Sequence, residues 1–144
     1  MKPILLVVAP YYQAISEMLV SGATDAIYAA GRTAEMITVP GALEIPAAIA
    51  LAARSDRYAA YVALGCVIRG ETTHYEIVSN ESARALMELA THQHLPIGNG
   101  ILTCETMEQA VARATVAQGN KGGEAAVAAL RMLAIAHTFG LDLS

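Results

Sequence analysis

The run Arg69–His74 (Arg-Gly-Glu-Thr-Thr-His) concentrates side chains that could do chemistry. Gly70 lets the backbone turn tightly and approach a ligand, and the two threonines offer hydroxyl donors. Thr73 and Glu76 have the spacing of a capping box, which predicts that a helix begins at His74. The free N–H groups of a helix start bind phosphate, and an imidazole beside them could exchange protons. The run is therefore either a phosphate site with a general acid or base, or an ordinary capped helix with an exposed histidine.

Other turns offer further candidate ligands. Tyr11 and Tyr12 follow the first apolar run and could stack on a flat ring or form an exposed aromatic pair at an interface. Glu44 follows Pro-Gly-Ala-Leu at the start of a predicted helix, where a carboxylate either stabilises the helix or binds ligand hydroxyl groups. Residues 119–123 are glycine-rich like a phosphate loop, but no Ser or Thr follows Lys121, which excludes that motif.

Apolar runs typical of strands alternate along the chain with segments typical of helices. Buried strands are predicted where apolar runs lack polar alternation, at residues 4–9, 35–39, 58–68 and 97–103. Helices are predicted from apolar spacing over residues 13–30, 44–54, 73–92, 107–117 and 122–138. This order predicts one α/β domain over residues 1–144, a flavodoxin-like three-layer α/β/α sandwich with a four-stranded parallel sheet. Such sheets bind ligands beyond the carboxyl ends of their strands, where the turns above meet.

The composition excludes several classes of protein. The 144 residues are 55% hydrophobic and 15% charged, which is too apolar for disorder. Nine Lys and Arg against thirteen Asp and Glu give no basic footprint for nucleic acid. The apolar runs are far shorter than the roughly 20 residues that span a membrane. The apolar excess, and a last helix with few charges, predict burial between subunits and hence a homo-oligomer.

The two cysteines, Cys66 and Cys104, lie in apolar segments with no Cys or His nearby at metal-ligand spacing. Buried, reduced thiols are the favoured interpretation, and a disulfide or metal pair is the alternative. Reduced thiols indicate a cytoplasmic protein, because disulfides persist mainly in oxidising compartments.

Four stretches, in order and spacing, resemble the lumazine synthase family of riboflavin biosynthesis. They are Val39–Pro46, Ala63–His74, Asn99–Thr103 and Gly119–Gly122. The resemblance covers nearly the whole chain. It implies the condensation of 5-amino-6-(D-ribitylamino)uracil with 3,4-dihydroxy-2-butanone 4-phosphate, releasing phosphate and water, with neither metal nor organic cofactor. It also implies a homo-oligomer whose active sites lie at subunit interfaces.

The resemblance assigns a role to each matching residue. His74 matches the proton donor or acceptor, and Arg113 matches an arginine that reaches the phosphate from a neighbouring subunit. The other implied substrate contacts are Tyr11 with the uracil ring, Ala42, Leu43 and Glu44 with the ribityl chain, Cys66, Val67 and Ile68 with the pyrimidine, Glu71 and Thr72 with the phosphate, and Asn99 and Lys121 near the pyrimidine site.

Two departures from the family pattern affect the ring site. Asn99 stands where many members have an aromatic residue, and Pro10-Tyr11-Tyr12 replaces a more usual Arg-aromatic-Asn. The chain also begins almost directly at its first predicted strand, whereas capsid-forming members commonly have a longer leading segment. This difference favours a pentamer. In the family, an insertion between the residues that match Arg113 and Lys121 is associated with blocked capsid closure, and this chain has no insertion there, so a capsid is the alternative assembly.

Three other functions fit parts of the same pattern. An archaeal-type riboflavin synthase has this fold and joins two lumazines, but its substrate carries no phosphate. A non-catalytic relative could bind flavin or lumazine, or act as an assembly scaffold, with the same residues. A flavodoxin-type FMN carrier is disfavoured, because its first turn is rich in Ser, Thr or Gly and this one is Pro10–Gln13 (Pro-Tyr-Tyr-Gln).

Overall fold

Four parallel strands form the centre of the computed structural model, which describes residues 1–143. They are β1 (Ile4–Val8), β2 (Ala34–Thr38), β3 (Ala60–Ile68) and β4 (Ile97–Cys104), in the sheet order β2-β1-β3-β4. In register, Val8 of β1 lies beside Leu64 of β3, and Ile68 at the end of β3 lies beside Cys104 of β4. The predicted four-stranded parallel sheet is confirmed.

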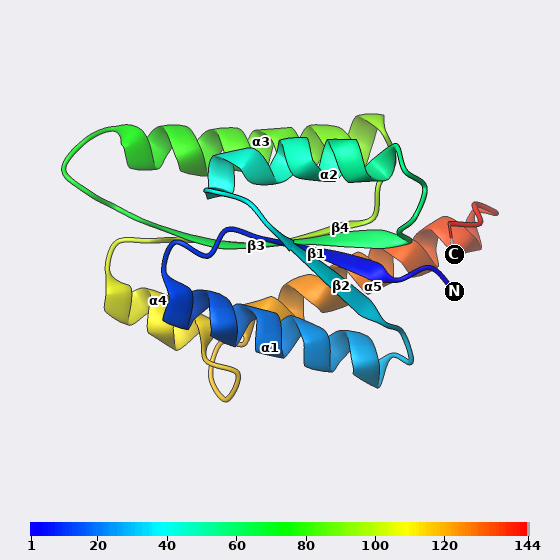
Figure 1. The fold of residues 1–144 in the computed structure, drawn as a ribbon, viewed down its shortest axis with the longest axis horizontal. Coiled ribbons are helices and arrows are strands. Elements are labelled where there is room, and N and C mark those ends of the chain that lie inside the picture. Colours follow the sequence, from blue (N-terminus) through cyan, green and yellow to red (C-terminus); the bar gives the residue numbers. More distant parts are fainter. Residues whose placement is uncertain (144) are drawn as a thin grey trace.

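Helices cover both faces of this sheet (Figure 1). They are α1 (Gln13–Ala29), the short 3-10 turn η1 (Ala42–Glu44), α2 (Ile45–Ala53), α3 (His74–His92), α4 (Met107–Ala114) and α5 (Lys121–Thr138). Helices α2 and α3 lie on one face, and α1, α4 and α5 lie on the other. The predicted three-layer sandwich is therefore confirmed. The predicted helix over 107–117 is too long, because Thr115 adopts an extended backbone (φ −58°, ψ 125°) and ends α4 at Ala114.

The core consists of two apolar clusters, one on each face of the sheet. Strand β1 is buried along its whole length, and its residues alternate between the two clusters. A parallel sheet covered on both faces needs such unbroken apolar strands, which explains the sequence pattern. The turns that follow the strands all lie at one end of the sheet, to the left in Figure 1.

Glycines allow α5 to pack unusually close to its neighbours. A Cβ atom at Gly98 of β4 would lie 1.8 Å from the backbone oxygen of Ala125, and one at Gly122 would lie 2.0 Å from that of Leu19 in α1. Both distances are far inside van der Waals contact, and both neighbours are backbone atoms that belong to packed helices. Helix α5 therefore holds β4 and α1 together through backbone contact.

We expect Gly98→Ala to lower the free energy of unfolding by about 2–3 kcal/mol, because the added methyl group overpacks the interface between β4 and α5. The matched control is Gly65→Ala in β3, where a Cβ atom would make ordinary contacts of 3.5 Å and beyond. Urea denaturation at equal protein concentrations measures both variants. Equal stability of the two variants would contradict the close approach at Gly98.

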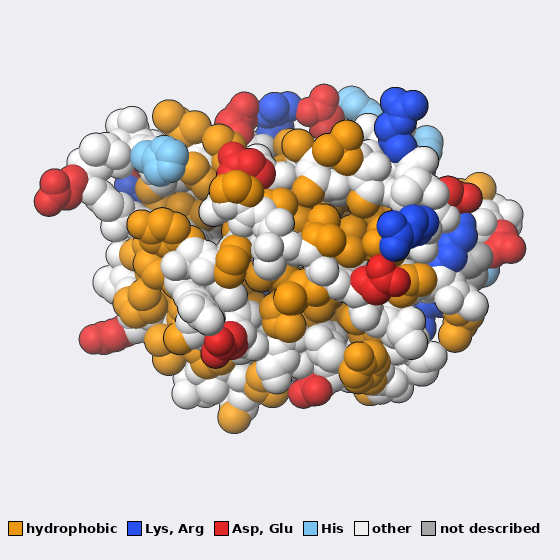
Figure 2. All heavy atoms as spheres, viewed as in Figure 1, with side chains coloured by type: hydrophobic (Ala, Val, Ile, Leu, Met, Phe, Trp, Pro, Cys, Tyr) orange, Lys and Arg blue, Asp and Glu red, His pale blue; other side chains and the backbone are white. Residues whose placement is uncertain are grey.

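Apolar side chains also reach the surface of the isolated chain. Figure 2 shows them across the middle of one face, with most of the charged side chains toward its rim. Exposed examples include Met36 and Ile37 on the edge strand β2, Leu51 on α2 and Val127 on α5. Within residues 1–143, no helix is both long and apolar enough to cross a lipid bilayer.

Candidate active site

A pocket of about 390 Å³ lies at the carboxyl ends of β1 and β3, between the turns that follow β1 and β2 and the start of α3. Its walls are Tyr11, Tyr12, Gly41, Ala42, Leu43, Glu44, Cys66, Val67, Ile68, His74 and Val78. The structure therefore brings together eight of the predicted site residues, which come from three separate turns and the end of a strand. Parallel strands make this possible, because their carboxyl ends meet at one edge of the sheet.

The start of α3 differs from the predicted capping box. His74 is the first helical residue, as predicted, but among residues 1–143 the Thr73 side chain forms no capping hydrogen bond. Instead, the Thr72 hydroxyl oxygen accepts the backbone N–H of His74 at 3.3 Å. The Glu76 carboxylate pairs with Arg69, which keeps it from reaching back to Thr73. A charged partner from the turn that follows β3 thus outcompetes the local capping pattern.

Arg69 joins three elements at the edge of this pocket. Its guanidinium donates to Glu76 in the first turn of α3 and, at 2.7 Å, to Glu105 in the turn after β4. The Arg69 guanidinium lowers the pKa of Glu76, and the hydrogen bond to Glu76 raises the pKa of Arg69. The Glu76 carboxylate therefore stays ionised to lower pH than an ordinary glutamate side chain.

The first turn supplies an aromatic wall. Tyr11 is 77% exposed and meets Tyr12 edge to face, with ring centroids 4.9 Å apart and planes at 79°. Tyr12 is half-buried against the core, and burial followed by the neighbouring Tyr11 raises the pKa of its hydroxyl. The inner ring therefore supports the outer one, which leaves a face of Tyr11 accessible for stacking.

The second turn contributes a carboxylate. Gly41 is extended, the chain then forms η1, and the Glu44 backbone N–H donates to the Gly41 carbonyl at 3.1 Å. The Glu44 carboxylate folds back over Gly41, where one of its oxygens would lie 3.1 Å from an added Cβ atom. Gly41 thereby leaves room for the carboxylate at the pocket wall.

The two cysteines are neighbours on the α1 side of the sheet, and both are free. Cys104 is buried, and Cys66 is half-buried at the pocket wall. Burial, with a smaller effect from Cys104, raises the pKa of the Cys66 thiol to about 12. Cys66 therefore presents a neutral, weakly polar surface to the pocket rather than a nucleophile.

We expect Cys66 in the native protein to react with a disulfide reagent at pH 8 about 1,000-fold more slowly than an ordinary thiol, because its thiolate fraction falls with the raised pKa. Burial favours the neutral form of the Cys66 thiol in the folded state. The contribution of this thiol to the free energy of unfolding is therefore complete below its pKa in the unfolded chain and is lost as pH rises from about 9 toward about 12. Absorbance of the released thiolate follows the reaction, and urea-unfolded protein is the control. Rapid labelling of one thiol per native chain would contradict this assignment.

Five predicted site residues do not line the pocket within residues 1–143. Glu71 and Thr72 lie in the exposed turn beside it. Asn99 lies on the edge strand β4, where its side chain accepts the N–H of Ile101 at 3.0 Å. Arg113 is exposed in the last turn of α4, which lies on the other face of the sheet from α3. Lys121, at the start of α5, pairs with Glu124 at 3.1 Å.

Sequence reasoning missed two parts of the pocket wall, Val78 and Gly41. Val78 lies one helical turn after His74 and therefore on the same face of α3, a signal that the spacing already contained. Gly41 has no signal in the sequence beyond its place in the stretch Val39–Pro46, because its role depends on where the Glu44 carboxylate folds.

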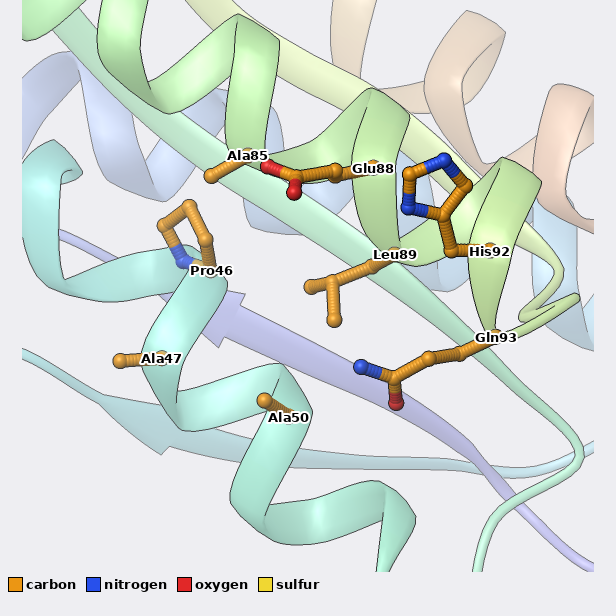
Figure 3. A pocket seen from close by; sticks show the side chains of 8 residues that line it. All are labelled: Pro46, Ala47, Ala50, Ala85, Glu88, Leu89, His92 and Gln93. Atoms are coloured by element: carbon orange, nitrogen blue, oxygen red, sulfur yellow. The ribbon is translucent and has the colours of Figure 1, made fainter.

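A second pocket, of about 300 Å³, lies between α2 and α3 (Figure 3). Its walls are mostly apolar, with Glu88, His92 and Gln93 along the α3 side. None of the predicted site residues is among those that line it. No group of three or more His, Cys, Asp or Glu side chains within residues 1–143 is arranged to hold a metal ion.

Comparison with known proteins gives matches along nearly the full chain. The family model for 6,7-dimethyl-8-ribityllumazine synthase matches residues 2–137. A protein of that name from Methylorubrum populi is 58% identical, over 96% of this chain and 85% of its own length. Relatives with the same name from Sphingopyxis alaskensis (58% identical, 98% and 99% covered) and Bartonella henselae (55% identical, 95% and 90% covered) match equally broadly. The family match includes every residue that lines the pocket at the carboxyl ends of β1 and β3.

Proposed function

The chain belongs to the 6,7-dimethyl-8-ribityllumazine synthase family, and we propose that its reaction takes place in the pocket at the carboxyl ends of β1 and β3. The enzyme is a transferase that condenses 5-amino-6-(D-ribitylamino)uracil with 3,4-dihydroxy-2-butanone 4-phosphate. The primary amine attacks the ketone to form an imine with loss of water, and elimination of phosphate leaves a new carbonyl on the adjacent carbon. The ribitylamino nitrogen then attacks that carbonyl with loss of a second water, which closes the ring of the lumazine. The convergence of Tyr11, Glu44, Cys66 and His74 on one pocket is the observation that carries this assignment.

The pyrimidine binds along the Tyr11 side of the pocket in this proposal. The uracil ring stacks on Tyr11, and Cys66, Val67 and Ile68 line its edge. The ribityl chain extends along Ala42 and Leu43, and its hydroxyl groups donate to the Glu44 carboxylate. Neutral Cys66 suits this position, because a thiolate would repel the electron-rich ring.

The butanone phosphate binds at the turn before α3, with Glu71 and Thr72 on its phosphate side. The Thr72 oxygen accepts the His74 N–H, so the Thr72 hydroxyl proton remains available to donate to a phosphate oxygen. The helix dipole gives the amino-terminal end of α3 a partial positive charge, which favours an anion as well. His74, at that helix start and in the pocket wall, exchanges protons with the reacting amine and ketone.

A neighbouring copy of the chain completes the site. We place Arg113 on the phosphate, and Asn99 and Lys121 near the pyrimidine, of the adjacent subunit's pocket. Their positions on α4, β4 and α5, away from the pocket of their own chain, support this arrangement. The exposed apolar side chains on β2, α2 and α5 also suit burial between subunits.

The assembly that we propose is a cytoplasmic homopentamer in which residues 1–144 form one lumazine-synthase-like domain. The two free cysteines support the reducing compartment. Analytical ultracentrifugation would give about 75 kDa for five 15.1 kDa chains, whereas a capsid would be many times larger. A monomer at working concentration would overturn the shared site.

The activity is tested by mixing purified protein with both substrates and following lumazine fluorescence and released phosphate together. The reactants condense slowly without protein, so that rate is measured in parallel. Equal amounts of lumazine and phosphate, formed well above the background rate, are expected. Conversion of lumazine alone to riboflavin would indicate a riboflavin synthase instead, and tight flavin binding without turnover would indicate a binding protein.

A further inference from the structure

The turn that carries Glu71, Thr72 and His74 has few contacts of its own. Residues 70–74 are exposed, and a Cβ atom at Gly70 would meet nothing within 4 Å in the described chain. The start of α3 is held locally by the hydrogen bond from His74 to Thr72 and by backbone bonds from Glu76 and Ile77 to the Thr73 carbonyl. Such a turn needs an anchor from elsewhere if it is to hold a substrate in one geometry.

Arg69 immediately precedes this turn and is held in place by contacts of both its backbone and its side chain. Its backbone N–H donates to the Cys104 carbonyl at 2.9 Å, which fixes it to β4. Its guanidinium pairs with Glu76 and Glu105, and its Cζ atom lies 4.4 Å from the centre of the Tyr75 ring. These contacts join the end of β3, the first turn of α3 and the turn that precedes α4.

We propose that Arg69 is a positioning residue that fixes the turn 70–73 and the first turn of α3, so that the backbone at Glu71 and the Thr72 hydroxyl are held in place for the butanone phosphate and His74 is held in place for proton transfer. The inference rests on the proposed function, because that function places the phosphate at this turn. Arg69 does not line the pocket, and it acts through His74, which does, and through Glu71 and Thr72 in the turn beside it.

The arrangement favours positioning over direct binding of phosphate. Two carboxylates already occupy the Nε and Nη1 sides of the guanidinium, and the two negative charges would repel an incoming dianion. The task also suits arginine in particular, because a planar fork can bind two carboxylates while it stacks on an aromatic ring. A lysine ammonium is a point charge and cannot reproduce all three contacts.

The test compares Arg69→Gln and Arg69→Lys with the matched control Arg84→Gln. Arg84 is also exposed and also pairs with two carboxylates, Glu81 and Glu88, but all three residues lie within α3. The control therefore loses the same charge and the same number of ion pairs without disconnecting any element. Hydrogen exchange of the backbone amides of residues 70–76, thermal stability and steady-state kinetics are measured on each assembled enzyme.

In Arg69→Gln, we expect the backbone amides of residues 70–76 to exchange hydrogen about 10-fold faster. The exchange rates in the rest of the chain and the melting temperature should be nearly unchanged. The KM for butanone phosphate should rise about 10-fold and kcat should fall, because a small misplacement of binding groups has a large effect, while the KM for the pyrimidine stays constant. Arg69→Lys should recover part of both changes. Arg84→Gln should resemble the unmodified enzyme.

The outcomes separate this inference from the function on which it rests. Unchanged exchange over residues 70–76 in Arg69→Gln would overturn the positioning role, whatever the kinetics. Faster exchange with unchanged KM and kcat would overturn the placement of phosphate at this turn. Equal effects of Arg69→Gln and Arg84→Gln would reduce Arg69 to a general surface charge. An inactive unmodified enzyme would instead refute the proposed function itself.

Discussion

Arg113→Ala is expected to lower turnover at low butanone phosphate concentration by about 100-fold or more, mainly through a higher KM for that substrate. A guanidinium fork forms two charge-assisted hydrogen bonds with a phosphate, and each contributes about 1.5–3 kcal/mol. The loss should therefore equal or exceed that of His74→Ala under the same conditions. Steady-state kinetics, corrected for the reaction without enzyme, measure it, and normal affinity for butanone phosphate in Arg113→Ala would refute the phosphate role.

The matched control is Arg57→Ala, which removes an arginine from the turn before β3, at the amino end of the sheet. Arg57 contacts Glu35 at 3.5 Å and the Tyr58 ring, far from the turns that form the pocket. Its removal should leave both KM values unchanged. Arg113→Lys should recover only part of the affinity, because it restores the charge without the fork.

Mixed subunits test whether Arg113 serves the neighbouring site. In pentamers reassembled from equal amounts of Arg113→Ala and His74→Ala chains, about one quarter of the sites would combine an intact His74 with an intact Arg113 across an interface. About one quarter of the original activity should therefore return. If both groups served the pocket of their own chain, every site would lack one of them and no activity would return.

His74→Ala should lower kcat by about 100-fold with little change in either KM, because a positioned acid or base contributes about 10²–10⁴-fold and the arylamine is already a good nucleophile. His74→Gln should fall equally far, since an amide can form a hydrogen bond but cannot exchange the proton. Recovery of activity in His74→Gln would show that hydrogen bonding, rather than proton transfer, is the role of His74.

The control for this variant is His92→Ala at the other end of α3, where the side chain is exposed and borders the pocket between α2 and α3. Both variants remove one imidazole from the same helix, so a general effect on α3 would appear in both. Added imidazole should restore part of the activity of His74→Ala and should leave the rate of the reaction without enzyme unchanged. This rescue gives a second measure of proton transfer.

Much of the fold follows from local sequence. The unbroken apolar run at β1 predicts a strand buried on both faces, and β1 is buried from end to end. The strand and helix bounds agree within two residues in most elements, because apolar spacing reports the face that each element buries. The end of α4 was missed because no glycine or proline marks it, and the turn of the backbone at Thr115 has no such local signal.

Only part of the candidate site can be predicted from local sequence. Parallel strands bring their following turns to one edge, so the sequence alone predicts that Tyr11, Glu44 and His74 approach one another, and all three line one pocket. The predicted capping box at Thr73 is wrong because the partner of Glu76 lies outside α3. Its Glu76 pairs with the guanidinium of Arg69, which follows β3, and no pattern within α3 reveals that competitor.

The sequence by itself determined the order of strands and helices, the layers of the sandwich and the turns in which we propose that the chemistry lies. These depend on spacing and composition over a few neighbouring residues. The tertiary structure decided which turns share a pocket, that Cys66 and Cys104 are neighbours, and that Arg69 joins three elements. It also placed Asn99, Arg113 and Lys121 away from that pocket. Those contacts depend on the sheet order β2-β1-β3-β4 and its register, which join residues that are distant in the chain and that no local pattern pairs.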